Sequence, residues 1–458
     1  MSLTGDEPLR IRALRIAGAT RTRASVIEAE LQEAYAAETF EEVVLALHGA
    51  VSRLQKTGVF RSVTIDMEGS RDASERDVTD LVVTVEEKGL FGVQANLHAN
   101  SVEATADSTV MLHNPLGSAE TLAISGGAGT NSSYSSSARF HRPRFLGLPA
   151  HLEVALGRTR TSCASTSSYD KKEKRFGVCI TDDAGGHRLD WMLAFRDLVP
   201  LRDAATPYAT LASRAVLYDC TQPSLKNSLA YEFTRDVRDD KTSPTQGTMF
   251  NARAEVAGLA GGNVYFNSLL VKAQHVVPVG PRFLFGLPGV NIALGAKIGA
   301  IQPWGVDSDR AESQQVTGVR ICDRFQLGGP LSFRGFKVNG VGPRAPPVGS
   351  NGTSPGGDSL GAEGVAIMSL RVDAPAPFPI LADFGMRAHL FLNAGNLLPL
   401  RYMFSNDFKK TMRASAGVGL AFGTGFGRVE MNYTLWHRNE AYDQFVPGFQ
   451  WGLGADFL

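Results

Sequence analysis

The chain has 458 residues, and its 46 Lys and Arg balance its 46 Asp and Glu, so no overall field draws it to nucleic acid. Its four cysteines form no C-x-x-C pair and have no His nearby, which predicts free thiols and no zinc site. No apolar run approaches the ~18 residues of a membrane helix. The first residues, MSLTGDEPLR, lack the apolar core of a secretory signal. An Arg-rich organellar transit peptide over residues 10–23 is the alternative, although that stretch continues into a patterned domain.

Residues 1–88 predict a small α+β domain with the order strand, helix, helix, strand, strand. Ser25-Val-Ile-Glu28 and Thr39-Phe-Glu-Glu42 each place a carboxylate three residues after a hydroxyl, the spacing of a capping box at a helix start. The second helix carries an apolar stripe and ends at Gly58, which suits a left-handed C-cap. The predicted strands are 9–16, 59–65 and 81–85. The edges of such a sheet suit an added peptide strand, and an ordinary packed spacer domain is the alternative.

Residues 89–458 show a different pattern, in which apolar and polar residues alternate over segments of about ten residues. Gly, Pro, Asn, Asp and Ser separate these segments. The clearest examples are 91–98, 250–256, 291–298, 386–393 and 429–436. A soluble β-sandwich shows the same alternation. However, the pattern continues for about 370 residues without a helix, and charged groups recur at mid-strand on the polar face, as in a wet lumen.

Closing such a sheet satisfies its backbone groups in hydrocarbon. With ~10 residues per strand and one short and one long loop per pair, the region holds roughly sixteen strands. The sequence therefore predicts a mainly β chain, in which a transmembrane β-barrel of roughly sixteen strands at 89–458 follows one small α+β domain at 1–88.

No catalytic or cofactor motif accompanies this pattern. The stretch Gly423-Thr-Gly-Phe-Gly427 lacks the strand–helix context and the Lys of a phosphate loop, so it predicts a hairpin turn. The sequence contains no H-E-x-x-H or GK[ST] motif. We therefore expect no enzyme, no cofactor and no metal site.

The most unusual segment is GGPLSFRGFKVNGVGPR, residues 328–344. Seven of its seventeen residues are Gly or Pro, which indicates a loop. Its centre, Phe333-Arg334-Gly335-Phe336, places a cation between two aromatic residues. This loop and the domain order resemble the outer-membrane barrel insertase superfamily, which has a POTRA domain before a sixteen-stranded barrel and a (V/I)RGF loop, here at about 325–345 with Phe in the first position. The single POTRA-like domain and the lack of a signal peptide favour the mitochondrial branch, the core subunits of the sorting and assembly machinery.

The resemblance implies roles for residues in and around the loop. In the family the loop folds back into the lumen, and its Arg pairs with acidic or amide groups on the inner wall. Carried to this chain, Arg334 docks the loop, with Glu363 as its expected partner and Asn393 nearby. Bacterial relatives have Asp at the position of Asn393. The uncharged amide of Asn393 cannot form the ion pair that such an Asp could form. A guanidinium in a confined lumen needs a fork-shaped acceptor, and Phe333 and Phe336 are expected to pack against the wall. A loop whose Arg334 faces solvent is the alternative.

The C-terminal segment 450–457 is similar to the β-signal of mitochondrial barrel proteins, with polar and small residues on one face and apolar residues on the other. The resemblance implies a lateral gate between the first and last strands. Glycines in the last strand would weaken its pairing. The residues expected at the gate are Phe91, Val93, Gln94, Gln450, Gly452, Gly454 and Phe457.

The resemblance also implies a function. The chain is expected to be a core insertase that folds and inserts β-barrel precursors into the mitochondrial outer membrane, with the POTRA-like domain in the intermembrane space. The C-terminal β-signal of a precursor would pair at the open gate by β-augmentation. The expected partners are these precursors, the lipid bilayer and accessory subunits of the assembly complex, and no nucleic acid. The alternative is a polypeptide-translocating barrel of the same superfamily, a secretion or import channel.

Overall fold

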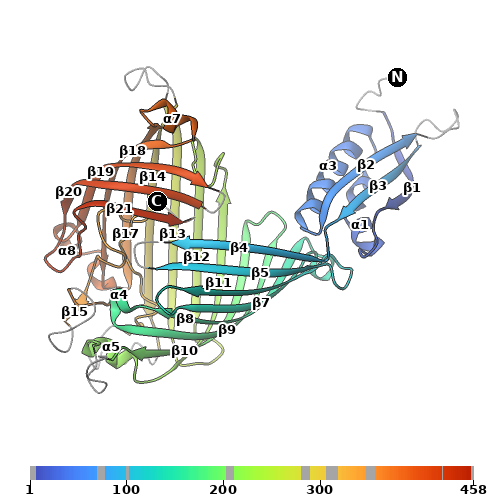
Figure 1. Ribbon diagram of the computed structural model, residues 1–458. Helices are drawn as coiled ribbons and strands as arrows, with labels where there is room; N and C mark the ends of the chain where they lie inside the picture. Colours follow the sequence, from blue (N-terminus) through green and yellow to red (C-terminus); the bar gives the residue numbers. More distant parts are fainter. Residues whose placement is uncertain are drawn as a thin grey trace.

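The computed structural model describes residues 7–69, 78–99, 103–202, 211–279, 289–305, 318–346, 356–424 and 427–454. A small α+β domain at the N-terminus stands beside one large curved sheet, and the two are joined where strands of the sheet begin and end (Figure 1). In this part of the chain, no helix has the length and apolar character needed to span a bilayer. The same residues contain no group of three or more His, Cys, Asp or Glu placed to hold a metal ion.

The N-terminal domain packs three helices on a three-stranded sheet. Its elements are β1 (Arg10–Ala17), α1 (Ala24–Glu30), α2 (Gln32–Ala36), α3 (Phe40–Lys56), β2 (Phe60–Gly69) and β3 (Val78–Glu87). Strand β3 lies in the centre, parallel to β1 and antiparallel to β2. The apolar stripe of α3 supplies Val43, Leu47 and Leu54 to a core that Leu81 and Val83 of β3 complete. Burial of this stripe stabilises α3 more than helix propensity does.

The two predicted helix starts have different outcomes. Thr39 caps α3 as predicted, because its hydroxyl accepts from the Glu42 N–H while the Glu42 carboxylate accepts from the Thr39 N–H. The capping box predicted at Ser25 is wrong, since α1 already begins at Ala24 and no side chain caps it. Instead, the N–H of the preceding residue, Arg23, donates at 3.0 Å to the carbonyl of Gly117, which lies in a turn between two strands of the large sheet. A tertiary contact therefore sets the start of α1.

The rest of the chain forms one antiparallel sheet of sixteen strands. Its strands are β4 (Phe91–Ala99), β5 (Ala104–His113), β6 (Thr121–Gly129), β7 (Tyr134–Arg142), β8 (Ala150–Ser162), β9 (Tyr169–Asp182), β10 (His187–Pro200), β11 (Ser224–Asp236), β12 (Gly247–Ala257), β13 (Phe266–Val279), β14 (Val290–Pro303), β17 (Gly364–Pro375), β18 (Arg387–Leu398), β19 (Arg413–Thr424), β20 (Gly427–Arg438) and β21 (Gly448–Gly454). Each strand pairs with the next, and β14 pairs with β17. The predicted mainly β fold with sixteen strands is confirmed.

Short elements lie in the connections between these strands. They are η1 (Phe145–Gly147), α4 (Ala164–Ser167), α5 (Arg214–Asp219), β15 (Arg344–Ala345), β16 (Asp358–Ser359), α7 (Pro379–Asp383), η2 (Leu400–Tyr402) and α8 (Asn406–Lys410). Strands β15 and β16 pair with each other within the long connection between β14 and β17.

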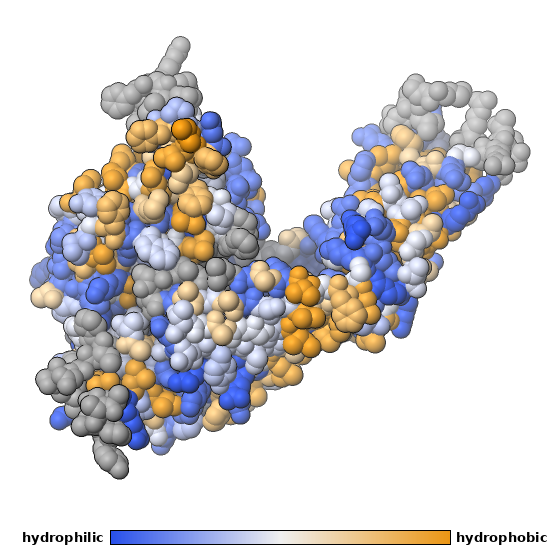
Figure 2. Space-filling view, in the orientation of Figure 1, coloured by the Kyte–Doolittle hydropathy of each residue, from blue (hydrophilic) through white to orange (hydrophobic). Residues whose placement is uncertain are grey.

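Alternation decides which face of the sheet each side chain occupies. On β20, Arg428, Glu430 and Asn432 are buried on the inner face, whereas Met431 and Tyr433 are exposed on the outer face. Figure 2 shows apolar residues gathered over α7 and the strands beneath it. Apolar outside and polar inside is the pattern of a barrel in a bilayer. The five segments predicted from alternation coincide, to within one residue, with parts of β4, β12, β14, β18 and β20.

The first and last strands of the sheet come beside each other. Cα atoms of β4 and β21 approach within 8 Å, and Figure 1 shows the two strands adjacent. In the described parts of both strands, however, no hydrogen-bonded ladder joins them, and the sheet order ends at β4 on one side and β21 on the other. The sheet therefore curls into a barrel with one unpaired seam.

The N-terminal domain is attached to the turns that follow β5 and β7. Asn114 of the β5–β6 turn donates to the Thr22 hydroxyl at 2.7 Å. Arg144 of the β7–β8 turn forms an ion pair with Glu30 of α1, with Nη2 2.7 Å from Oε2. Within the domain, the Glu87 carboxylate accepts from the Thr22 N–H at 2.8 Å, which stabilises the segment that meets the barrel. The domain therefore stands at the barrel end where β4 begins.

Candidate functional site

The long connection between β14 and β17 turns back into the barrel. Its described parts are 318–346 and 356–363. The side chains of Phe333, Arg334 and Phe336 are 0% exposed, so the centre of this connection is buried and not solvated. Residues 328–344 are called the docking loop below.

Arg334 forms a bidentate ion pair with Glu430 of β20. Its Nε and Nη2 donate to Oε2 and Oε1 at 2.9 and 3.0 Å, and both side chains are 0% exposed. A planar guanidinium matches a carboxylate in this geometry. The Phe391 ring centroid lies 5.7 Å from Arg334 Cζ, which adds a cation–π contact. Loss of Glu430 would deprive the buried Arg334 of its bidentate carboxylate, which is costly inside a protein, so this pair holds the loop at one position on the wall.

Glu430 is also the centre of a larger charge network on β17 and β20. Arg428 Nε donates to it at 2.7 Å, and Arg371 Nη1 lies 3.7 Å from it. Asp373 accepts from Arg371 Nε at 2.8 Å and lies 3.6 Å from Arg428 Nη2. The three arginines of this network, one from the loop and two from the wall, share two carboxylates. Each carboxylate therefore compensates more than one buried cation.

The wall also binds the backbone of the docking loop. The Gly335 N–H donates to Gln450 Oε1 at 3.0 Å, and Gln450 Nε2 donates to the Phe336 carbonyl at 2.6 Å. The Ser415 hydroxyl donates to the Arg334 carbonyl at 2.6 Å. Gly335 has φ = +85°, a conformation that glycine adopts without strain. The Arg-Gly-Phe turn is thus held by hydrogen bonds from β19 and β21.

Phe333 and Phe336 form an apolar cluster beside the ion pair. Their ring centroids are 5.2 Å apart, and they pack with Val365 and Ile367 of β17 and Leu397 of β18. Burial of an aromatic side chain of this size contributes ~1.5–3 kcal/mol. The apolar contacts therefore stabilise the docked loop together with the ion pair.

The structure gives Arg334 a different partner from the one predicted. Glu363 stands just before β17, and the basic side chains near it are Arg324 and Arg401. Glu363 therefore lies where the connection rejoins the wall, and Glu430 is the carboxylate that Arg334 reaches. Asn393 of β18 is 0% exposed, and both polar atoms of its side chain lack a hydrogen-bond partner among the described residues.

A second anchor of opposite polarity holds the start of the connection. Asp323 accepts from Arg196 of β10 at 2.8 and 3.0 Å and from Lys226 of β11 at 3.3 Å. Glu255 of β12 lies 2.7 Å from Lys226. Here the connection supplies the acid and the wall supplies the bases, whereas the reverse holds at Arg334. Because the two anchors cannot exchange partners, they determine how the connection crosses the lumen.

The gate residues predicted on β4 divide between the two faces of the sheet. Phe91 and Val93 are 70% and 74% exposed on the outer face. Gln94 alternates with them, and its amide donates to Asn96 Oδ1 at 3.2 Å. The outer edge of the seam on this side is therefore apolar, and the inner edge is polar.

The gate residues predicted on β21 face the docking loop. A Cβ at Gly452 would lie 2.5 Å from Pro330 Cγ, and a Cβ at Gly454 would lie 2.8 Å from Leu331 Cδ1. The two glycines thus make room for the loop, a role that the sequence did not indicate. Phe457, the last predicted gate residue, lies outside the described residues.

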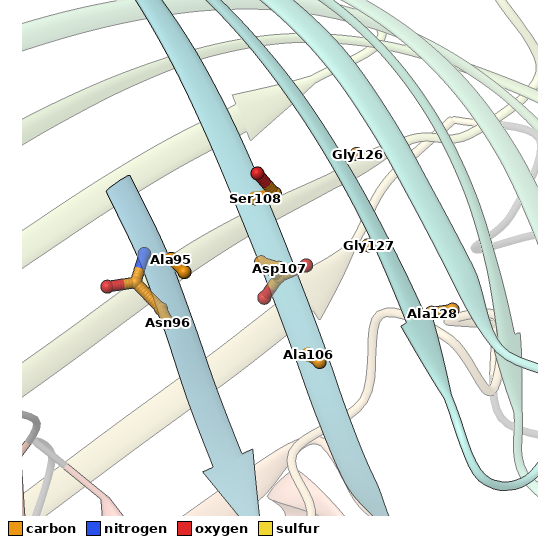
Figure 3. Close-up of a pocket in the computed structure, with 8 residues that line it drawn as sticks. All are labelled: Ala95, Asn96, Ala106, Asp107, Ser108, Gly126, Gly127 and Ala128. Atoms are coloured by element: carbon orange, nitrogen blue, oxygen red, sulfur yellow. The ribbon is translucent and has the colours of Figure 1, made fainter. Parts of the chain in front are cut away.

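The sheet on the other side of the seam contains a hollow. It has a volume of about 690 Å³ and crosses β4, β5 and β6 (Figure 3). Its lining residues are small: Ala95, Asn96, Ala106, Asp107, Ser108, Gly126, Gly127 and Ala128. Side chains of this size make few van der Waals contacts across a sheet. The wall next to β4 is therefore lined at this hollow by small side chains, and no docking loop packs against them there.

Sequence reasoning missed Glu430 and Asp323. The signal for Glu430 is a carboxylate on the polar face of an alternating segment, but many other lumen positions share that signal. Arg334 and Glu430 are 96 residues apart, and their contact depends on the curvature of the whole sheet.

Comparison with known proteins identifies a family with these features. The Omp85 superfamily domain matches residues 114–457. The chain is 28% identical to a SAM50-like protein of Schizosaccharomyces pombe, over 98% of this chain and 91% of that protein. It is 29% identical to the sorting and assembly machinery component 50 homolog of Homo sapiens, over 96% of this chain and 89% of that protein.

Solved structures with a similar fold include BamA from Haemophilus ducreyi lacking POTRA domains 1–3, with a TM-score of 0.72 and 18% identity over 97% of this chain and 84% of that chain. CdiB from Escherichia coli is more distant, with a TM-score of 0.54 and 13% identity over 97% of this chain and 76% of that chain. With an Omp85 domain over three quarters of its length and a sixteen-stranded transmembrane β-barrel that follows a small α+β domain, the chain belongs to the Omp85 superfamily.

Proposed function

We propose that this chain is the core of an insertase that folds β-barrel precursors into the mitochondrial outer membrane. Its similarity, over nearly the full length, to proteins named as components of the sorting and assembly machinery supports this role. The observation that carries the proposal is the seam, where β4 and β21 lie side by side without a ladder in their described residues. Strand edges without a partner are templates for an incoming strand.

The seam suggests how a precursor enters. Strand β21 is the end strand of the sheet that faces β4 across the seam, so the last strand of a precursor, its C-terminal β-signal, takes its place and pairs with β4 by β-augmentation. Later strands of the precursor then add as hairpins. Because each step exchanges hydrogen bonds between strand edges, insertion requires no nucleotide.

The docking loop keeps one side of this gate in place. Gln450 binds the loop backbone, and Gly452 and Gly454 pack against Pro330 and Leu331. Strand β21 is thus held from inside the barrel, and the seam opens by movement of the β4 side. The POTRA-like domain, attached at the barrel end where β4 begins, faces the intermembrane space and receives precursors there, and accessory subunits of the assembly complex bind to the barrel.

The test is a reversible lock across the seam. Val93→Cys and Leu453→Cys are introduced together in a chain whose four native cysteines are replaced by Ser, since both side chains lie on the outer face at the two edges. Liposomes containing this variant receive a radiolabelled β-barrel precursor. We expect oxidation to reduce integration of the precursor to the level of empty liposomes, and reduction to restore it, with both single-cysteine variants unaffected.

Two outcomes would contradict the proposal in different ways. If the locked barrel integrates precursors normally, the seam is not the gate. If precursors cross the bilayer but never become integrated barrels, the chain is a polypeptide-translocating channel.

A further inference from the structure

An outward-facing group of basic residues lies on β8 and β9, near the barrel end opposite the N-terminal domain. Arg196 of β10 binds the connection inside the barrel and lies opposite Glu173 in the sheet register. Glu173 therefore faces the lumen, and its neighbours Lys172 and Lys174 face outward. The register places Lys174 opposite Arg158 on β8. Arg158, Lys172 and Lys174 are all exposed.

The register brings like charges together on this outer face. Arg158 lies opposite Lys174, and Arg160 lies opposite Lys172. Directly opposed side chains on antiparallel strands have Cβ atoms only ~4.5–5.5 Å apart, and like charges there destabilise the sheet. Asp170 compensates Arg160, with 2.6 Å between Nη2 and Oδ2.

The charge that remains uncompensated is concentrated at Arg158 and Lys174. Asp197 lies opposite Lys172 on β10, but Phe195 occupies the matching place opposite Lys174. The Tyr134 ring lies 5.6 Å from Arg158 Cζ. In the described part of the chain, neither Arg158 nor Lys174 has an acidic partner. The pair is therefore suited to an external anion.

Apolar side chains continue this outer face from the basic pair toward the middle of the barrel. Leu156 and Phe176 lie opposite each other, two residues from Arg158 and Lys174. Leu156 and Phe195 are exposed. A molecule that matches this surface carries an anionic group at one end and hydrocarbon at the other. A soluble acidic protein matches the bases but not the apolar residues, which face hydrocarbon in a membrane.

We propose that the outer face of β8 and β9 binds an anionic phospholipid. Its phosphate bridges Arg158 and Lys174, with Tyr134 and Lys172 at the edge of the site, and its acyl chains lie against Leu156, Phe176 and Phe195. A guanidinium provides several N–H donors to phosphate oxygens, and an ammonium adds a compact charge. A zwitterionic lipid brings a cationic group close to the same bases. The site therefore prefers lipids with net negative charge.

The experiment measures lipid binding to the full chain purified in neutral detergent. Fluorescent phosphatidylglycerol and phosphatidylcholine are titrated into wild type, into Arg158→Gln/Lys174→Gln, and into Lys409→Gln/Lys410→Gln. The last variant removes the same charge from exposed positions of α8, in a loop at the same barrel end. We expect wild type and the α8 variant to prefer phosphatidylglycerol, and the β8–β9 variant to lose affinity for it by roughly tenfold to thirtyfold.

Three results would overturn the proposal. Equal affinity of wild type for both lipids would exclude selection by charge. Full competition by inorganic phosphate at the same concentration as the lipid would exclude a role for the apolar residues. Undiminished phosphatidylglycerol binding by the β8–β9 variant, with loss of a co-purifying acidic polypeptide, would assign the face to a protein. A gel-mobility check for heat-modifiable folded barrel confirms that each variant is folded before it is compared.

Discussion

The two walls that flank the seam are built differently. On the C-terminal side, from β17 to β21, inner side chains are buried and bind the docking loop, as Glu430, Asn432 and Gln450 do. On the N-terminal side, from β4 to β7, several inner positions carry short polar side chains that bond within their own strand or to nearby strands of the wall. Examples are Asp107 with Ser135 at 3.2 Å and Thr109 with Ser125 at 2.9 Å. One wall is held from inside the lumen, and the other is held at its end by the N-terminal domain.

This difference indicates where a barrel of this kind can open. Opening the seam on the β21 side would require the loss of a buried ion pair, several hydrogen bonds and the packing of two aromatic side chains. Opening it on the β4 side disturbs small side chains beside a hollow. Regions with few buried apolar contacts open at low free energy. We therefore expect β4 to β7 to move while β17 to β21 stay in place.

The largest expected effect comes from Glu430→Ala in the β17–β21 wall, which binds the docking loop. The substitution leaves Arg334, Arg371 and Arg428 with one carboxylate fewer in a buried site, and breaking such a pair costs ~3–5 kcal/mol. We expect a lower midpoint of denaturant unfolding, measured by Trp fluorescence in detergent, and protease cleavage within the docking loop.

The matched control for this variant is Asp107→Ala in the β4–β7 wall. Asp107 bonds a hydroxyl in a partly exposed position, so its loss costs about 1 kcal/mol or less. If both variants lose the same stability, the contacts with the docking loop do not stabilise the β17–β21 wall more than the β4–β7 wall is stabilised by its own side chains.

The next effect tests how closely the loop and β21 are packed. A side chain at Gly452 would collide with Pro330, so Gly452→Leu either displaces the loop or strains the strand, at a cost of ~1–3 kcal/mol. We expect faster hydrogen exchange in residues 328–344 and a seam that opens more easily. Gly69→Leu, at a position where a Cβ meets nothing within 4 Å, is the control. Unchanged exchange in the loop of Gly452→Leu would refute the packing role of this glycine.

An acid titration tests the attachment of the N-terminal domain. Burial raises the pKa of Glu87, but hydrogen bonds from Thr22, Thr20 and the Arg21 N–H outweigh it and lower the pKa to about 2. The unfolded carboxyl titrates near ~4.3. The pKa of Glu87 is lower in the folded protein than in the unfolded chain, so the carboxylate stabilises the folded state fully above pH ~4.3. This stabilisation is lost as the pH falls from ~4.3 toward 2.

We expect hydrogen exchange of residues 18–23, corrected for intrinsic rates, to rise through this pH window in wild type. In Glu87→Gln the exchange is already raised at neutral pH, because the amide loses the charge-assisted bonds, each worth about 1.5–3 kcal/mol. A wild-type profile as flat as that of Glu87→Gln would contradict the assignment.

Part of this architecture was predictable because the environment imposes a simple rule. A strand between lumen and bilayer alternates polar and apolar residues. The sequences of β12 and β14 follow this period closely enough to predict both that the strands exist and which of their side chains face the bilayer. The start of α1 was not predictable. Ser25 has the capping spacing, but a contact between Arg23 and Gly117 sets the helix start, and no local rule includes the barrel.

The candidate site was predictable only on the loop side. The resemblance identified Arg334 and its flanking aromatics, yet it suggested Glu363, a carboxylate near the loop in sequence. Glu430 is much farther along the chain and reaches Arg334 because the sheet curls until β20 lies beneath the loop. Which of two acidic residues becomes the partner depends on curvature accumulated over many strands, and the local pattern carries no information about it.

The smallest expected effect uses the same substitution in both walls. At Gly126 of β6 a Cβ meets nothing within 4 Å, whereas at Gly417 of β19 it would lie 2.2 Å from the Tyr433 carbonyl and 2.8 Å from the Phe391 ring. Gly126→Ala restricts the unfolded chain without a clash, so we expect it to stabilise the barrel by ~0.4–1 kcal/mol. Gly417→Ala is expected to lower the unfolding midpoint in the same assay. Effects of the same sign at both positions would show that the wall beside β4 is as tightly packed as the wall beside β21, and the seam would then have no preferred side from which to open.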